Sequence, residues 1–250
     1  MRILLLLTSV TLCGCFPERV TTTVGGLKVL TFQHEFTNVH AVVHGGKVVL
    51  VDSGLERNVQ KLEADLVAEG LSPRDVVAVV VTHGHADHAG GARHFQQAYG
   101  AKVIAGRGDT TLFAEGRNDP LCPTNADARD RLAKDQAETY QPLVPDVLVD
   151  DAASLEALAG VPGEVLAVPG HTEGSLVLKV DRSLFVGDLL RGAIFTKDAD
   201  VHFYMCDLDD NANDIRGLLA SQPAVTTWFV GHFGPLTRAA VEAKFAAPPR

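Results

Sequence analysis

The chain has 250 residues, a formal net charge of -9 at pH 7, and 46% hydrophobic and 21% charged residues. The hydrophobic share supports a substantial core, and the charged share is near normal for a globular protein. The negative charge and the lack of any Lys/Arg run exclude a nucleic-acid surface, because phosphate binding requires clustered cations. We expect a soluble, acidic globular body.

The first residues predict an export signal. Arg2 supplies a positive charge, and the apolar stretch at residues 3–12 is too short for a helix that spans a membrane. The sequence LCGC at residues 12–15 resembles a bacterial lipobox, in which cleavage precedes a cysteine whose thiol is lipidated. We expect residues 1–14 to be a lipoprotein signal peptide and Cys15 to be lipidated. An ordinary cleaved signal peptide is the alternative.

Either kind of signal places the mature protein outside the cytosol. With Cys15 acylated, the protein is expected in the bacterial cell envelope, where the lipid anchor holds it to a membrane on the periplasmic or cell-surface side. Cys122 and Cys206 are then the remaining cysteines. The sequence leaves open whether these two thiols pair, because it does not place them within bridging distance.

The folded part is predicted to be a single domain at residues 20–250. Short β-branched or apolar runs separated by glycine pairs indicate antiparallel strands joined by hairpins. These runs cover residues 21–24, 28–32, 39–43 and 48–51. A helical pattern at residues 59–70 follows, and the apolar run at residues 76–81 predicts a buried strand.

Directly after this strand, residues 82–88 read THGHADH. His83, His85, Asp87 and His88 thus place three imidazoles and one carboxylate within six residues. The small residues between them let the backbone bend until these side chains converge. Neutral imidazole and carboxylate are ligands of zinc and iron, so the motif predicts a metal site. A solvated loop that happens to be rich in histidine is the alternative.

The rest of the chain alternates between strand and helix patterns. Residues 106–145 are polar and interrupted by proline, which predicts an insertion near the site with one charged helix at residues 126–138. Strands are predicted at residues 102–105, 147–149, 164–168, 175–180, 183–186 and 226–230, and helices after His88 and at residues 211–220 and 236–245. Strands that are first grouped and then interleaved with helices predict two sheets sandwiched by helices.

Four further short motifs stand beside these strands. They are VDSG at residues 51–54, PGHT at 169–172, VGD at 186–188 and GHFGP at 231–235. Together with His83-x-His85-x-Asp87-His88, they occur in the order found in the metallo-β-lactamase-fold hydrolases. The chain resembles that family over nearly its whole length after the first twenty residues. The resemblance implies an α/β fold, an αββα sandwich of two mixed β-sheets flanked by helices.

The resemblance also implies a ligand set for two metal ions. It assigns His83, His85 and His171 to one ion, Asp87, His88 and His232 to the other, and Asp188 as the bridge between them. Each ion then keeps room for a water molecule, as a catalytic site requires. Asp52 resembles a family residue that supports the loop carrying His83, His85, Asp87 and His88 without binding metal itself. Carboxylates in such positions orient the imidazoles that bind the metal.

Two divalent ions, zinc first and iron or manganese as alternatives, would hold a bridging hydroxide at neutral pH. We expect this hydroxide to attack the carbonyl of a small-molecule ester, lactone or thioester, with Asp87 orienting it. His202 and Tyr204, which follow Asp188, are predicted to contact the substrate. The sequence does not identify the acid that protonates the leaving group.

The resemblance leaves several activities open. Asp188 favours the glyoxalase-II-like and lactonase-like branches over β-lactam hydrolysis, which remains an alternative. The lack of a sizeable C-terminal helical domain before Arg250, together with export, argues against glyoxalase II itself. A persulfide-dioxygenase-like enzyme with one iron carries a similar motif and is a second alternative. A non-catalytic metal-binding lipoprotein is the third.

Overall fold

The computed structural model describes residues 19–24 and 26–247. The predicted signal peptide and the predicted lipidation site at Cys15 lie outside these residues. Within the described part of the chain, every helix is too short or too polar to cross a bilayer.

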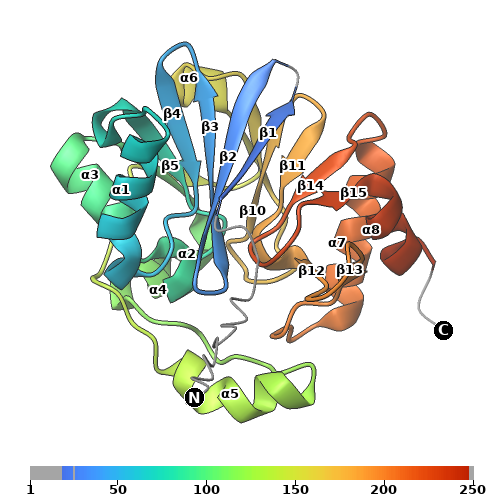
Figure 1. The fold of residues 1–250 in the computed structure, drawn as a ribbon. Helices are drawn as coiled ribbons and strands as arrows, with labels where there is room; N and C mark the ends of the chain where they lie inside the picture. Colours follow the sequence, from blue (N-terminus) through green and yellow to red (C-terminus); the bar gives the residue numbers. More distant parts are fainter. Residues whose placement is uncertain (1–18, 25, 248–250) are drawn as a thin grey trace, which may run out of the picture.

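Two β-sheets are stacked face to face between helices (Figure 1). The first sheet has seven strands in sequence order, antiparallel from β1 to β4 and parallel from β4 to β7. Its strands are β1 (Arg19–Val24), β2 (Leu27–His34), β3 (Thr37–His44), β4 (Lys47–Val51), β5 (Val76–Val80), β6 (Lys102–Gly106) and β7 (Val147–Val149).

The second sheet has six strands in the order β15-β14-β11-β10-β9-β8. Its neighbours are antiparallel except for the parallel pair β11 and β14. The strands are β8 (Ala152–Ser154), β9 (Glu164–Ala167), β10 (Leu176–Val180), β11 (Ser183–Phe185), β14 (Thr227–Phe229) and β15 (Leu236–Thr237). A separate two-stranded sheet pairs β12 (Arg191–Gly192) with β13 (Ala199–Asp200).

Helices cover the outer faces of both sheets. Helices α1 (Val59–Ala68) and α3 (Ala92–Tyr99) pack on the first sheet, and α7 (Leu208–Ser221) and α8 (Arg238–Phe245) pack on the second (Figure 1). The shorter helices are α2 (Ala86–Ala89), α4 (Thr110–Glu115), α5 (Ala126–Gln136) and α6 (Leu155–Ala159), with 3-10 turns η1 (Glu56–Asn58), η2 (Pro73–Asp75), η3 (Arg107–Asp109) and η4 (Gly187–Leu189). The predicted αββα sandwich of two mixed sheets is confirmed.

The central strands are buried on both faces, and this explains their nearly continuous apolar runs. In β4, Val48 and Leu50 pack toward α1 and α3, whereas Val49 and Val51 pack against the second sheet. Successive side chains of a strand point to opposite faces, so one strand contributes to two cores. Burying each such side chain contributes about 1.5–3 kcal/mol.

Three features differ from the sequence expectations. The helix expected at 236–245 begins at Arg238, because β15 pairs with β14 and the Thr237 hydroxyl caps the helix by accepting from the Ala240 amide. The helix expected past Gly90-Gly91 is confirmed as α3, but the short helix α2 within the THGHADH motif was not expected. Helices α4 and α6 were not predicted at all.

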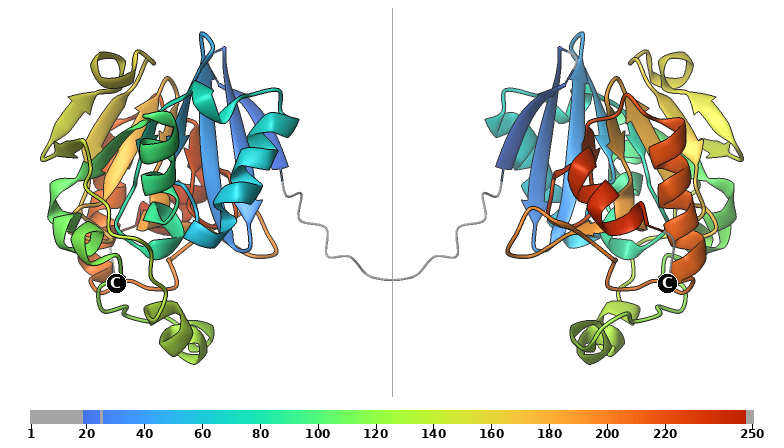
Figure 2. Two further views of the ribbon diagram at one scale, coloured as in Figure 1. Left: turned by 90° about the vertical axis from the view of Figure 1, so that its left-hand side faces the viewer. Right: turned by 90° about the vertical axis from the view of Figure 1, so that its right-hand side faces the viewer.

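The segment at residues 106–145 lies across one end of the sandwich, with α5 outermost (Figures 1 and 2). A disulfide joins Cys122 of this segment to Cys206, with a Cα–Cα distance of 4.9 Å. The pairing that the sequence left open is therefore present. It fixes the segment to the stretch between β13 and α7.

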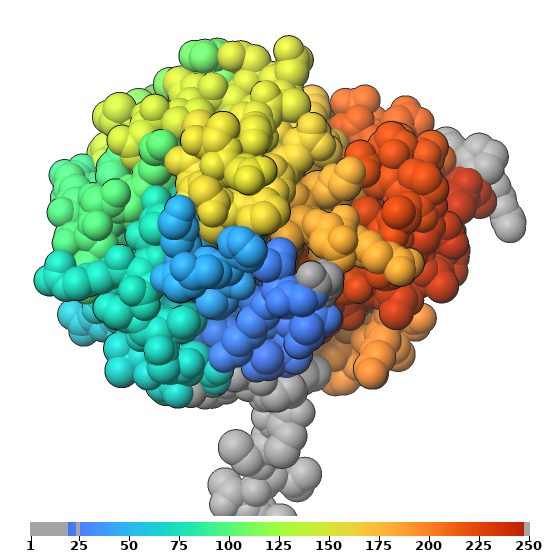
Figure 3. Space-filling model, turned by 90° about the horizontal axis from the view of Figure 1, so that it is seen from above, coloured from blue at the N-terminus to red at the C-terminus, as the bar shows by residue number. Residues whose placement is uncertain are grey.

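The opposite end of the sandwich is closed. Seen from above, α6 lies against the turn between β3 and β4, where the Lys47 ammonium donates to the Ala159 carbonyl (Figure 3). The loops that follow β4, β5, β9, β11 and β14 meet at the other end, across which the segment at residues 106–145 lies (Figure 1). The carboxyl ends of strands that run in the same direction share one edge, so the motifs read from the sequence converge there.

Candidate metal centre

The THGHADH loop begins where β5 ends. His85 precedes the first turn of α2, and the backbone between His83 and His85 passes close to α4. A Cβ on Gly84 would lie 2.7 Å from the Cβ of Leu112, so only glycine fits this turn. The loop is therefore shaped by contact with the segment at 106–145 as well as by its own sequence.

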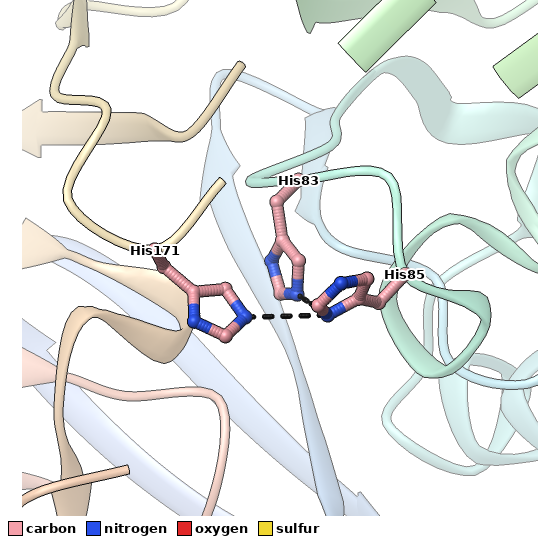
Figure 4. Close-up of side chains that lie close together, drawn as sticks. All are labelled: His83, His85 and His171. Atoms are coloured by element: carbon pink, nitrogen blue, oxygen red, sulfur yellow. Dashed lines mark hydrogen bonds between the residues drawn. The ribbon is translucent and has the colours of Figure 1, made fainter. Parts of the chain in front are cut away.

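His83, His85 and His171 form a first cluster (Figure 4). The Nδ1 atom of His85 lies 3.0 Å from Nε2 of His83 and 3.2 Å from Nε2 of His171. The far nitrogens of two of these rings are engaged, since Nδ1 of His83 donates to the Thr82 hydroxyl and Nε2 of His85 donates to Asp119. A neutral imidazole has one N–H, so the near nitrogens of His83 and His85 face each other as lone pairs.

Asp87, His88 and His232 form a second cluster. The Oδ2 atom of Asp87 lies 3.6 Å from Nε2 of His88 and 3.5 Å from Nε2 of His232. The far nitrogen of His88 donates to Asp52, and that of His232 donates to the Phe36 carbonyl. Both rings are thus held with their Nε2 atoms directed at the cluster.

The Asp188 carboxylate lies between the two clusters. Its Oδ2 atom is 3.8 and 3.9 Å from Nε2 of His83 and His171, and 3.3 and 3.2 Å from Nε2 of His88 and His232. Gly231 allows this approach, because a Cβ there would lie 2.2 Å from Oδ1 of Asp188. One carboxylate therefore reaches both groups of imidazoles, as a bridging ligand does.

The electrostatics of the two clusters differ. Burial raises the pKa of Asp188, but the neighbouring imidazoles outweigh burial and hold that pKa well below its ordinary value. Burial and adjacent imidazoles hold the pKa values of His83 and His171 well below the ordinary range. Burial also opposes charge on His88, yet the carboxylates around it hold its pKa well above the ordinary value.

These residues fit a metal ion. The Nε2 atom of His88 and the Oδ1 atom of Asp188 are buried and have no hydrogen-bond partner among the described residues. A buried polar atom without a partner costs about 1–3 kcal/mol, and facing lone pairs add repulsion. A divalent cation satisfies both, and imidazole with carboxylate is a donor set that zinc accepts.

Of two carboxylates that support the ligands from behind, only one was predicted. Asp52, predicted to stand behind the metal loop, accepts hydrogen bonds from the Thr82 amide and hydroxyl and from His88. Asp109 was missed by sequence reasoning. It accepts from the Gly84 amide, the Gly174 amide and the Thr172 hydroxyl, and so ties the loop of His85 to the loop of His171. Its position at the carboxyl end of β6 was the available signal.

The segment at 106–145 also supplies residues that the sequence did not indicate. Asp119 accepts from His85, the Asn118 side chain accepts from the Ala86 amide, and the Tyr140 hydroxyl donates to the Gly84 carbonyl. The segment was predicted to lie near the site, but these contacts show that it holds the metal loop in place. Sequence reasoning did not single out Asp119.

A pocket opens over the two clusters. It is lined by Phe36, Leu55, Leu121 and Phe203 on its apolar side, and His85, Asp87, Asp188 and His232 reach it from the metal centre. His202 and Tyr204, predicted as substrate contacts, line it as well. The structure thus brings all seven predicted ligands together, with Asp52 behind them and the two further residues beside the pocket.

Comparison with known proteins agrees with this geometry. A sequence profile described as the Metallo-beta-lactamase superfamily matches residues 34–234. A hydroxyacylglutathione hydrolase of Anaeromyxobacter dehalogenans is 34% identical over 146 residues, which cover 58% of this chain but only 43% of that protein. A protein of Bacillus subtilis named as a probable metallo-hydrolase is 28% identical over 182 residues, covering 71% and 72% of the two chains.

Among solved structures, a metallo-beta-lactamase family protein from Thermus thermophilus superposes with a TM-score of 0.63 at 26% identity. The match covers 89% of this chain and 79% of that one. Because the family profile spans most of the chain, and the fold and the clustered side chains agree with it, this chain belongs to the metallo-beta-lactamase superfamily.

Proposed function

We propose that the chain is a hydrolase of ester, lactone or thioester carbonyls that works with two divalent ions, zinc first. The observation that carries this proposal is the position of Asp188, whose one carboxylate oxygen lies within 3.9 Å of imidazole nitrogens from both clusters. A single-ion site has no need of a carboxylate placed between two groups of ligands.

When bound, the two ions would supply a hydroxide nucleophile at neutral pH and Lewis acidity toward the carbonyl oxygen. The protein's own contribution is orientation. The Thr37 hydroxyl donates to Oδ2 of Asp87 at 2.9 Å, so that this carboxylate is held at the floor of the pocket. Burial opposes ionisation of Asp87, but His88 and His232 outweigh it and lower the pKa, so Asp87 is charged and acts as a hydrogen-bond acceptor near the reacting atoms.

The pocket favours a substrate with an apolar part next to the carbonyl. Phe36, Leu55 and Phe203 give one side of it an apolar lining. The Tyr204 hydroxyl donates to Asp135 at 2.6 Å and lies 3.1 Å from the Ala128 carbonyl oxygen, so Tyr204 offers the substrate its ring more readily than its hydroxyl. The hydroxyacylglutathione hydrolases among the relatives support a thioester as one of the substrate classes.

Metal analysis combined with a hydrolysis screen tests the proposal. Purified protein should carry up to two zinc-like ions per chain and hydrolyse members of a panel of thioesters, lactones and simple esters faster than β-lactams. Asp188→Asn keeps the shape of the side chain and removes the charge between the clusters. It should lower metal content and rate together, with partial recovery in excess zinc.

Two results would overturn the assignment. One iron per chain together with oxygen uptake on a persulfide would identify a dioxygenase. Full metal content and an unaltered pH profile in Asp188→Asn would show that Asp188 is only a turn residue.

We also propose that the protein is exported and held to a membrane by a lipid at Cys15. The lipobox-like sequence at residues 12–15 motivates this, and the Cys122–Cys206 disulfide supports an oxidising compartment. Cys15→Ser should abolish acylation and release or mislocalise the protein. The absence of any lipid mass on the wild-type protein would contradict the proposal.

A further inference from the structure

His202 points a buried nitrogen at the metal centre. It lies between β13 and α7, and the residue is 3% exposed. Its Nε2 atom is 3.0 Å from Oδ2 of Asp188, and it has no other partner among the residues that the structure describes. That carboxylate oxygen also faces the Nε2 atoms of four other imidazoles, so the direction of this ring calls for an explanation beyond ordinary core packing.

The other ring nitrogen has a partner that suits a metal ligand. Nδ1 of His202 lies 3.1 Å from the Tyr204 carbonyl oxygen, which can only accept, and the Tyr204 amide lies 3.3 Å from the same nitrogen. When Nδ1 donates to the carbonyl, Nε2 carries a lone pair, and this is the tautomer that a ligating His202 would have. A ligating histidine characteristically donates its far N–H to a carbonyl or carboxylate. His88 and His232 make that same kind of contact here.

The ring of His202 also lies among the predicted ligands. It stacks on His232 with ring centroids 5.1 Å apart and meets the edge of His171 at the same separation. Ligand atoms of His171, Asp188 and His202 all lie within 4.8 Å of one another. We propose that His202 is an eighth ligand side chain of the metal centre, binding through Nε2 to an ion that it shares with His171 and Asp188.

The backbone around His202 is held firmly enough to serve this role. The Thr124 hydroxyl donates to the His202 carbonyl at 2.8 Å, and the Thr124 amide donates to the Phe203 carbonyl at 2.9 Å. The Cys122–Cys206 disulfide closes the same pair of segments a few residues further on. The imidazole is therefore presented to the centre by a covalently fixed loop.

The proposal rests on the metal centre of the proposed function, and it is tested by metal binding alone. Wild type, His202→Ala and His202→Gln are titrated with zinc against a competing chelator, and their cobalt-substituted forms are compared by visible absorption. Loss of a ligand should weaken one ion at least about tenfold, since even the partners behind metal ligands contribute 10–100-fold. The cobalt spectrum should change in both variants.

Two control variants test whether a change in metal affinity comes from loss of the His202 imidazole. One tests the effect of disturbing the same loop, and the other tests the effect of removing a histidine elsewhere. Tyr204→Phe loses the hydrogen bond to Asp135 on the same segment but keeps His202. His94→Gln removes a histidine that pairs with Glu63 away from the centre. Both should bind metal as wild type does.

If the His202 variants bind both ions with unchanged affinity and an unchanged cobalt spectrum, the proposal is wrong. A raised KM under those conditions would identify His202 as a substrate contact only. Failure of the proposed function is distinct from this, because it would appear in the wild-type protein as fewer than two ions or no ester, lactone or thioester hydrolysis.

Discussion

Asp52→Asn should weaken the second cluster by reversing the tautomer of His88. Asp52 sits at φ 62°, a backbone conformation that asparagine also adopts, so the substitution leaves the main chain in place. The asparagine oxygen can keep the bond to the Thr82 amide, which the structure shows at 2.7 Å. The new amide nitrogen then faces Nδ1 of His88, where a carboxylate oxygen now accepts a hydrogen bond at 2.8 Å.

Two N–H groups cannot bond to each other, so His88 must move its proton to Nε2, the atom that faces Asp188 and Asp87. A protonated Nε2 is unable to bind metal. Outer partners of ligating histidines contribute about 10–100-fold in metal affinity, so the second-cluster ion should bind more weakly by about that factor. At about 1.36 kcal/mol per tenfold change, this is about 1.4–2.7 kcal/mol.

Competition titration of zinc with a chromophoric chelator measures the zinc affinity of each cluster. His232→Ala removes a second-cluster ligand, so it identifies which of the two binding steps belongs to that cluster. Thr82→Val is the matched comparison. It removes the hydroxyl that links Asp52 to His83 and should weaken the first cluster instead. If Asp52→Asn leaves both zinc affinities at their wild-type values, the tautomer argument is refuted.

Three further outcomes are expected. Burial lowers the pKa of His88, but the surrounding carboxylates, chiefly Asp188, outweigh burial and raise it. Zinc binding at the second cluster should therefore release protons and become stronger as the pH rises. A zinc titration in weak buffer with a pH indicator measures this release, and no release would contradict the expectation. Gly231→Ala should lose metal, because its Cβ would overlap Asp188, whereas Gly217→Ala in α7 meets no atom within 4 Å and should keep full metal content by elemental analysis. Reducing the Cys122–Cys206 disulfide, which joins residues 84 apart, should lower the free energy of unfolding by about 2–4 kcal/mol, and an unchanged urea midpoint would contradict this.

The sequence by itself determined the parts of this protein that depend on local pattern. The apolar run at residues 76–81 predicted a strand buried on both faces, and the structure confirms β5 there. The ligand residues could be named because short motifs next to strand ends resemble, in their order, those of the metallo-β-lactamase-fold hydrolases. Side-chain alternation and strand direction are properties of a few consecutive residues, so they can be read without the rest of the chain.

Only the tertiary structure decided which distant side chains support those ligands. Asp119 reaches His85 across 34 positions, and Asp109 reaches Gly174 across 65. The direction of His202 depends on a loop fixed by Thr124 and by the disulfide. Contacts of this kind follow from how whole segments pack, and no periodicity in the sequence encodes them. The two sheets had to pack together before the polar segment between β6 and β7 could support a metal centre at their common end.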